Sequence, residues 1–434
     1  MSKQNEGFSS ILGFIMVAIG LALGIGTLWR FPYVVGENGG AIFIFLYILI
    51  ILVIGIPLMT CEVTIGYATG NAAIDAYKTL KPNTKWYLAG YLHTLAALII
   101  VGYTSVIYAW IIKYIAGAFM GDFVGLDSQG IQTYFDAFNA NKTTVFIFFL
   151  INFALNNAVI ILGVQKGIER VSKILIPVLF VIMIVIIFFG LRLPGAKEGI
   201  TFLFKPDFSK FSFNSIITCL GQAFFALGLA MLGSMVFGSY IKEKDENIFK
   251  DSTVICLALV FAGILSGFMI LPIVFATGLT PGEGVGLTFL TLPLAFNVVP
   301  FGRILSILFY FGFYIAAFTS SVGVLEAIVG QFMERFKLER IKALMLASAI
   351  IVLIAAVSIF YDPAFAFLDN VESNYILVIG CLIIALFSAR AWKMENVIEA
   401  ANIKSPFVKA WMNISIKYIS PIVIVIIFLS QFIK

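Results

Sequence analysis

The chain has 434 residues, of which 61% are hydrophobic and only 12% are charged, with a mean hydropathy of +1.05 and a net charge of +5. Soluble domains carry about twice this charged fraction, so the composition excludes a soluble globular protein. The apolar residues form long blocks joined by short polar loops, and blocks of about 20 such residues are typical of membrane-spanning helices. The net positive charge therefore belongs to the loops of a multi-pass membrane protein, and we expect no nucleic-acid partner.

Eleven membrane spans are predicted within one transmembrane domain, 1–434. In chain order they cover 11–35, 41–69, 88–118, 144–163, 168–190, 212–240, 252–278, 302–332, 341–360, 365–388 and 412–432. If the N-terminus is cytoplasmic, the loops rich in lysine and arginine all fall on one side, for example around Lys78, Arg170 and Arg335. Because such loops stay in the cytoplasm, we expect an inner or plasma membrane protein with a cytoplasmic N-terminus. An odd number of spans then places the C-terminus outside.

Two of the spans are interrupted by glycine. The first contains Gly20, Gly24 and Gly26 and is followed closely by Arg30. Glycine weakens a helix, and a charge in lipid is costly, so irregular backbone at this depth is expected only where it lines a cavity. The sixth span is interrupted in the same way at Gly228. Close packing of helices through small residues is the alternative explanation.

Interrupted spans that lie five spans apart predict two inverted five-helix repeats with a binding site at their interface. The repeats cover about 10–190 and 212–388, and 412–432 adds an extra helix. The predicted fold class is therefore an all-α integral membrane protein with broken helices 1 and 6.

Several motifs around the interruptions resemble those of the neurotransmitter:sodium symporters. They are Gly24-Ile25-Gly26-Thr27-Leu28-Trp29-Arg30-Phe31-Pro32-Tyr33, Glu37-Asn38-Gly39-Gly40, Gly55-Ile56-Pro57-Leu58-Met59, Gly221-Gln222-Ala223-Phe224-Phe225 and Thr319-Ser320-Ser321. The resemblance implies the leucine-transporter fold, a 5+5 inverted repeat with eleven transmembrane helices in this chain. It also implies sodium-coupled symport of an amino acid across the lipid bilayer by alternating access.

The resemblance implies a sodium site between the first and eighth spans. Its ligands match the carbonyl groups of Gly20, Leu23 and Ala316 and the hydroxyl groups of Thr319 and Ser320. Na⁺ prefers hard oxygen ligands, and a broken helix frees carbonyl groups that can supply them. We therefore expect Na⁺ to be the coupling ion at this site.

The family's first sodium site and its chloride site are not preserved. The first-site positions match Thr27, Ala226 and Leu259, which lack the two asparagines and the hydroxyl of the family pattern. The chloride positions match Tyr47, Gln222, Ala226 and Leu259, and the position of the carboxylate found in bacterial members is Gly263. We therefore expect one Na⁺ per substrate and no requirement for chloride.

The resemblance also implies a substrate pocket at the two breaks. Its residues match Ala22, Gly24, Ile25, Gly26, Ile100, Tyr103, Thr104, Phe225, Ala226, Gly228, Met231, Ser320 and Val324. Amide groups near Ile25 and Gly26 lie at a positive helix end and can receive a carboxylate. Monoamine carriers of the family have aspartate where this chain has Gly24, so the carboxylate is left to the substrate. The pocket leaves room for a bulky apolar or aromatic side chain.

The family's carboxylate-binding tyrosine in the third span matches Thr104, and Tyr103 is adjacent, so either residue could serve. The losses at Thr27, Leu259 and Thr104 suggest an alternative, a sodium-coupled transporter of an amine or a non-α zwitterion. A non-transporting sensor with the same fold is a further alternative. An enzyme is not expected, because the sequence has one histidine, no metal-binding cluster and no P-loop.

The resemblance implies gates on both sides of the pocket. Arg30 is expected to pair with Glu372 at the outer mouth, and Phe225 is expected to cover the substrate. Glu62 is expected to accept hydrogen bonds from the broken backbone of the sixth span.

The inner gate departs from the family pattern. The positions of the family's arginine and tryptophan match Asn5 and Phe8. Lys3 is the nearest cation, and Glu334 could form an ion pair with it.

Overall fold

The computed structural model describes residues 7–279 and 286–432, and these residues form helices and connecting loops without a β-strand. The eleven predicted spans are all present, and in the labels that follow η marks a short π-helical segment. They are α1 (Ile11–Ala22) with η2 (Gly26–Arg30) and α2 (Phe31–Glu37); α3 (Ala41–Ile50) with η3 (Ile51–Gly55) and α4 (Ile56–Thr69); α6 (Tyr87–Tyr103) with α7 (Ser105–Met120); α9 (Lys142–Ile161); η4 (Val164–Glu169) with α10 (Arg170–Gly190); α12 (Phe213–Leu227) with α13 (Gly233–Gly238); α14 (Ile248–Ala276); α16 (Gly302–Phe336); α17 (Arg340–Phe360); α18 (Asp362–Val371) with η6 (Glu372–Ile376), α19 (Leu377–Leu386) and η7 (Phe387–Ala391); and α21 (Pro406–Ile414) with η8 (Ser415–Ile419) and α22 (Ser420–Ser430).

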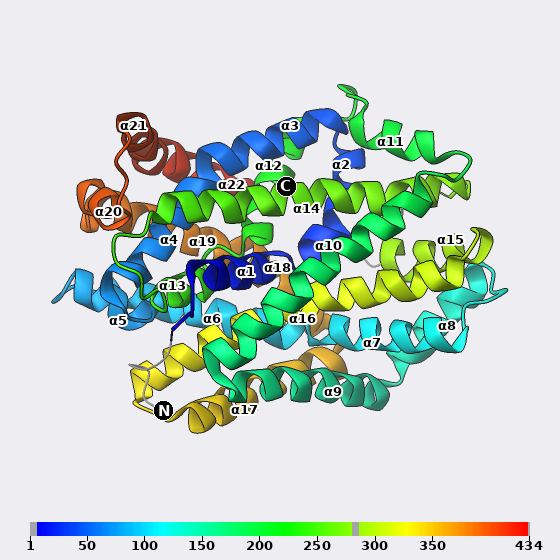
Figure 1. The fold of residues 1–434 in the computed structure, drawn as a ribbon, viewed down its shortest axis with the longest axis horizontal. Coiled ribbons are helices and arrows are strands. Elements are labelled where there is room, and N and C mark those ends of the chain that lie inside the picture. The colour runs from blue at the N-terminus through cyan, green and yellow to red at the C-terminus, as the bar shows by residue number, and fades with distance from the viewer. Residues whose placement is uncertain (1–6, 280–285, 433–434) are drawn as a thin grey trace.

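Shorter helices connect the spans at the two ends of the bundle. They are α5 (Ala73–Leu80), α8 (Ser128–Ala140), α11 (Ala196–Phe204), η5 (Leu287–Thr291) with α15 (Leu292–Val298), and α20 (Met394–Ala400). In Figure 1, α5 and α20 lie at the left end of the bundle, here called the α5 end, and α8, α11 and α15 lie at the right end, the α8 end. Among the described residues, nine helices are long and apolar enough to cross a membrane, and the bent first span makes ten. The sixth span consists of the two shorter helices α12 and α13.

The first span is broken where its glycines lie. Helix α1 ends at Ala22, and the chain resumes at η2 with a bend of 56° between the two halves. At a helix end, the last carbonyl groups have no helical N–H partner. The break therefore presents backbone oxygen atoms in the middle of the protein.

The sixth span is broken more severely. Gly228 ends α12 with a positive φ of 62°, and two non-glycine residues that follow, Ala230 (φ 62°) and Leu232 (φ 71°), are also left-handed. For non-glycine residues this conformation costs about 1–2 kcal/mol each, so surrounding contacts must hold it.

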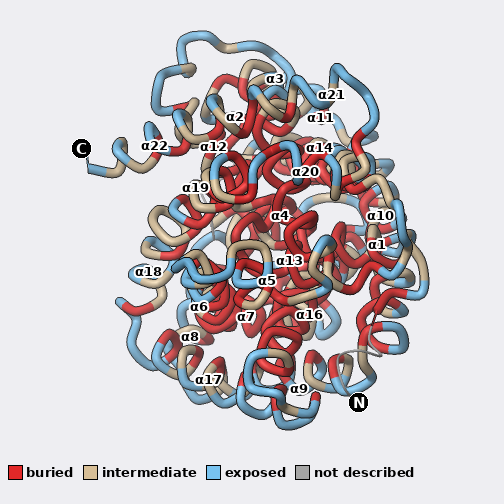
Figure 2. Tube along the Cα trace, turned by 90° about the vertical axis from the view of Figure 1, so that its left-hand side faces the viewer, coloured by how far each residue is buried: buried red, intermediate tan, exposed pale blue. Residues whose placement is uncertain are grey.

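The broken spans lie in the centre of the molecule. Helix α1 packs against α10, α14 and α16, and the most apolar stretch of α16 is 72% buried, whereas that of α9 is only 33% buried. Figure 2 shows the buried segments gathered in the middle and the exposed segments around the rim. Large apolar side chains are exposed on the peripheral helices, for example Leu155 on α9 and Leu353 on α17. This distribution is expected for a bundle whose rim faces lipid.

Candidate functional site

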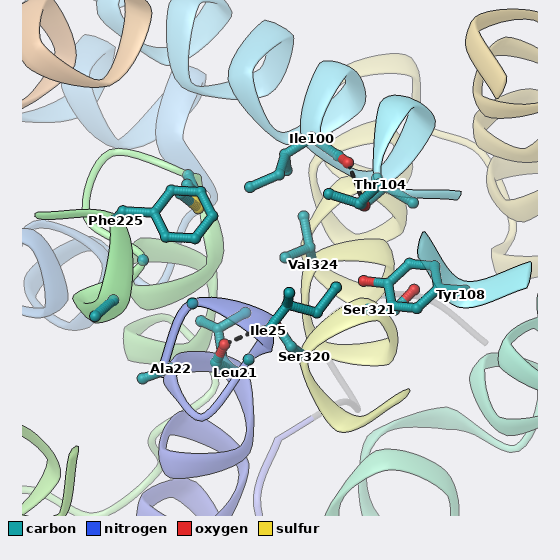
Figure 3. Close-up of a pocket in the computed structure, with 16 residues that line it drawn as sticks. Leu21, Ala22, Ile25, Ile100, Thr104, Tyr108, Phe225, Ser320, Ser321 and Val324 are labelled. Carbon is teal, nitrogen blue, oxygen red and sulfur yellow. Dashed lines mark hydrogen bonds between the residues drawn. The ribbon is translucent and has the colours of Figure 1, made fainter. Parts of the chain in front are cut away.

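A cavity lies between the two helix breaks. The empty space there, including the part that is open to solvent, is about 540 Å³. Figure 3 shows α1, α6, α12 and α16 side chains converging on it. The lining residues are Leu21, Ala22, Gly24, Ile25, Gly26, Ile100, Val101, Thr104, Tyr108, Phe225, Ala226, Gly228, Met231, Ser320, Ser321 and Val324. Every predicted pocket residue except Tyr103 is therefore brought to one cavity by the fold.

Tyr103 does not line the cavity. Its hydroxyl group donates a hydrogen bond to Asp369 Oδ1 at 2.9 Å, so the side chain faces α18. Neighbouring residues on a helix point about 100° apart. For this reason Thr104 can face the cavity while Tyr103 cannot.

Tyr108 lines the cavity and was missed by the sequence prediction. It lies four residues after Thr104, which places both on one helix face. Figure 3 shows the Tyr108 and Ser321 side chains side by side, and both residues line the cavity. The sequence did offer a signal for Tyr108. The family has a tyrosine at the position of Thr104, and this chain has a tyrosine four residues later, on the same helix face.

Among the residues that the structure describes, no charged side chain lines the cavity. Its polar groups are the hydroxyl groups of Thr104, Tyr108, Ser320 and Ser321 and the backbone of the two breaks. Any charge on a bound molecule must therefore be met by hydroxyl dipoles, backbone dipoles or a cation bound beside it.

The predicted helix 1/helix 8 sodium ligands converge next to this cavity. Thr319 Oγ1 lies 3.3 Å from the Gly20 carbonyl oxygen and 3.2 Å from the Ala316 carbonyl oxygen. Ser320 Oγ donates to the Leu21 carbonyl at 2.8 Å, and Leu23 is the C-cap that ends α1. Such neutral oxygen atoms around freed backbone suit a hard monovalent cation.

The backbone at the family's first sodium site is bonded by the protein itself. Ser266 Oγ donates to the Thr27 carbonyl at 3.0 Å, and Gln222 Nε2 donates to the Gly26 carbonyl at 3.1 Å. The Thr27 hydroxyl lies 3.5 Å from the Ala22 carbonyl oxygen. Leu259, where the family has asparagine, is a buried hydrocarbon side chain.

The expected outer gate pair is not formed in this structure. No hydrogen bond or ion pair joins Arg30 to Glu372 within the described part of the chain. Glu372 is fully buried, one of its oxygen atoms has no partner, and Ser373 Oγ contacts the other at 3.4 Å. Phe225 does lie at the cavity, half-buried next to Gly26.

At the α5 end, the described start of the chain is held by contacts with the sixth span and with η4. The Phe8 amide donates to the Tyr240 carbonyl at 3.1 Å, and the Phe8 ring packs against Phe237. Glu169, which is buried, accepts hydrogen bonds from the Ser9 amide at 2.8 Å and from the Lys173 ammonium group at 2.5 Å.

The other predicted inner-gate residues behave differently. Asn5 and Lys3 lie outside the described residues. Both carboxylate oxygen atoms of Glu334 lie 3.0 Å from the Ala72 amide, so this side chain holds the start of α5.

The prediction for Glu62 is confirmed. Its Oε2 atom accepts a hydrogen bond at 3.2 Å from the amide of Ala230, within the break of the sixth span.

Comparison with known proteins establishes the family. The model of the sodium:neurotransmitter symporter family matches residues 5–127 and 130–434. The chain belongs to this family. An uncharacterized sodium-dependent transporter of Bacillus subtilis is 34% identical over 99% of this chain and 98% of its own length. A similar transporter of Haemophilus influenzae is 33% identical, over 99% of both chains.

A solved structure confirms the fold of this symporter. The crystal structure of MhsT in complex with L-phenylalanine matches it with a TM-score of 0.90 and 36% sequence identity, covering 99% of this chain and 100% of that chain. The symporter is therefore a multi-pass membrane protein of the leucine-transporter fold that uses Na⁺. Its family and fold are those of transporters rather than enzymes.

Proposed function

We propose that this symporter imports a bulky apolar or aromatic amino acid together with Na⁺ by alternating access. The observation that carries the proposal is the uncharged cavity between two helix breaks, directly beside the oxygen atoms contributed by Thr319 and Ser320. The similarity to MhsT, whose structure contains L-phenylalanine, supports the same substrate class.

The cavity favours a zwitterion over a simple amine. The substrate carboxylate is assigned to the amides near Ile25 and Gly26, at the N-terminal end of η2, and to the Tyr108 hydroxyl. The ammonium group is assigned to the carbonyl groups of Ala22, Phe225, Ala226 and Gly228. An amine without a carboxylate would place no negative charge at the positive helix end. Gly24 has no side chain that could supply that charge in its place.

The apolar part of the cavity sets the size of the substrate side chain. Ile100, Val324 and the flexible Met231 form its walls. A Cβ atom added at Gly228 would meet no atom within 4 Å, so space is open at the helix 6 break. This space suits a large side chain.

In our proposal, the two inverted repeats, 10–190 and 212–388, rock around the site and so open it to each side of the membrane in turn. The segment 412–432 is an additional helix outside the repeats. We propose that the α5 end faces the cytoplasm, which places the N-terminus inside and the C-terminus outside an inner or plasma membrane. The lysine- and arginine-rich loops support this orientation.

Uptake into proteoliposomes tests the substrate class. With an inward Na⁺ gradient, we expect uptake of L-phenylalanine, L-tryptophan and L-leucine, and none when K⁺ replaces Na⁺. Phenethylamine, which is phenylalanine without its carboxylate, is the matched control and should neither enter nor compete. Uptake of phenethylamine in place of phenylalanine would favour the amine carrier, and Na⁺-dependent binding of phenylalanine without uptake would favour a sensor.

We further propose one Na⁺ per substrate and no chloride requirement. The Thr27 and Gly26 carbonyl groups already accept hydrogen bonds from Ser266 and Gln222, and Leu259 offers no ligand. At zero membrane voltage, a tenfold Na⁺ gradient should therefore sustain about a tenfold substrate gradient, against about a hundredfold for two ions. Measuring the maximal substrate gradient in chloride buffer and in gluconate buffer tests both the Na⁺ stoichiometry and the chloride requirement. A hundredfold gradient, or a loss of uptake in gluconate, contradicts the proposal.

A further inference from the structure

His93 is the single histidine of the sequence, and it lies beneath the helix 6 break. It belongs to α6 and is fully buried between Tyr77 of α5 and Ala230. Its Nδ1 atom lies 3.0 Å from the Ala230 carbonyl oxygen, and its Nε2 atom lies 3.1 Å from the Tyr77 hydroxyl.

These two contacts assign the protons of the imidazole ring. A carbonyl oxygen only accepts, so Nδ1 of His93 must carry a hydrogen and donate to Ala230. In the neutral ring Nε2 is then the acceptor, and the Tyr77 hydroxyl donates to it. The rings of Tyr77 and His93 are also nearly parallel, 23° apart at 5.9 Å between centroids. The Ala230 carbonyl therefore fixes the tautomer of His93, and Tyr77 orients its ring.

His93 completes the support of a strained peptide. Ala230 has a φ of 62°, a conformation that non-glycine residues rarely adopt. Glu62 accepts from the Ala230 amide and His93 donates to the Ala230 carbonyl, so side chains satisfy both backbone groups that the helix no longer satisfies. Since Gly228 and Met231 flank Ala230 and line the cavity, the position of this peptide affects the cavity wall.

We propose that His93, oriented by Tyr77, is a positioning residue that holds the helix 6 break in its binding geometry. The proposal rests on the proposed function in taking the cavity as the substrate site. The surroundings leave little room for water to replace the ring. A Cβ atom added at Gly380 would lie 2.6 Å from the Ala230 Cβ and 3.3 Å from His93 Cε1, so α19 packs tightly against both residues.

Asparagine and glutamine substitutions separate the two ring nitrogens. The amide nitrogen of His93→Asn can take the place of Nδ1 and still donate to Ala230, whereas the amide of His93→Gln reaches the place of Nε2. His93→Leu removes both contacts but keeps an apolar side chain in the site. We expect the KM for L-phenylalanine to rise about tenfold or more in His93→Leu and His93→Gln, and to stay within about threefold of the wild type in His93→Asn.

A second measurement needs no substrate. Hydrogen–deuterium exchange of the peptide that contains residues 228–232 should be faster in His93→Leu and His93→Gln than in the wild type, and nearly unchanged in His93→Asn. Tyr77→Phe should give intermediate exchange, because the ring loses its orienting donor. Thr94→Val is the matched control, since Thr94 is a buried neighbour in α6 whose hydroxyl donates to the Gly90 carbonyl of its own helix.

The results distinguish a positioning role from simple packing. Wild-type exchange and KM in His93→Leu, or equal effects of His93→Asn and His93→Gln, would overturn the proposal. If His93→Leu does not fold, the comparison of the asparagine and glutamine variants decides. If the wild type takes up no amino acid, the proposed function fails, while the exchange measurement still tests His93.

Discussion

Replacing Thr319 by valine is expected to weaken the Na⁺ dependence of uptake severely. The substitution keeps the shape of the side chain but removes the hydroxyl that lies within 3.3 Å of the Gly20 and Ala316 carbonyl oxygen atoms. The Cβ of Thr319 lies close to α1, since a Cβ added at Gly20 would be only 3.2 Å from it, so water has little space to replace the missing ligand. We expect the Na⁺ concentration for half-maximal uptake to rise about a hundredfold or more, equivalent to roughly 2.7 kcal/mol.

The matched control for this variant is Thr60→Val in α4. Thr60 is also fully buried, and its hydroxyl also donates to a carbonyl of its own helix, that of Ile56 at 2.7 Å. Thr60→Val therefore loses the same kind of intrahelical hydrogen bond but no contact to α1. If Thr319→Val requires no more Na⁺ than Thr60→Val, the helix 1/helix 8 site is not the coupling site.

Gly26→Ala is expected to lower substrate affinity by about tenfold or more without unfolding the protein. The added methyl group would lie 2.6 Å from two ring carbon atoms of Phe225, so the ring must move. Phe225 is half-buried at the cavity and can rotate at little structural cost, but it can no longer cover the substrate in the same place. Binding of L-phenylalanine in saturating Na⁺, measured together with the thermal unfolding temperature, checks both parts of this expectation.

Gly221→Ala supplies the control, because it makes the same substitution on α12 one turn before Phe225. A Cβ atom at Gly221 would meet no atom within 4 Å. Alanine also favours a helix interior over glycine by about 1 kcal/mol, so this variant should bind normally and be at least as stable. Equal affinities in the two variants would exclude Phe225 as the cover of the site.

Much of the architecture was predictable, because the bilayer imposes a strong constraint on sequence. Long apolar blocks separated by charged loops determine the number of spans, since backbone in lipid must be helical. Glycine at Gly20, Gly24 and Gly228 marked the two breaks, and the structure breaks the chain at Leu23 and at Gly228. Most residues that line the cavity were named from the resemblance to the symporter family, whose motifs surround the two breaks.

The predictions were wrong where a polar side chain has more than one possible hydrogen-bond partner. Tyr103 was an equal candidate with Thr104, but it bonds to Asp369 in a distant part of the sequence, and Tyr108 takes the place at the cavity. Within the described residues, Glu372 is buried and forms no hydrogen bond or ion pair with Arg30, so the expected pair is absent from this structure.

The sequence by itself determined that this protein is a helical membrane bundle with two broken spans, because hydrophobic length and glycine placement are local properties. Only the tertiary structure decided which polar groups meet. His93 shows the difference, since its partners Tyr77 and Ala230 come from a connecting helix and a distant break. Hydrogen bonds depend on distance and direction between segments far apart in the chain, and these are set only when the helices pack.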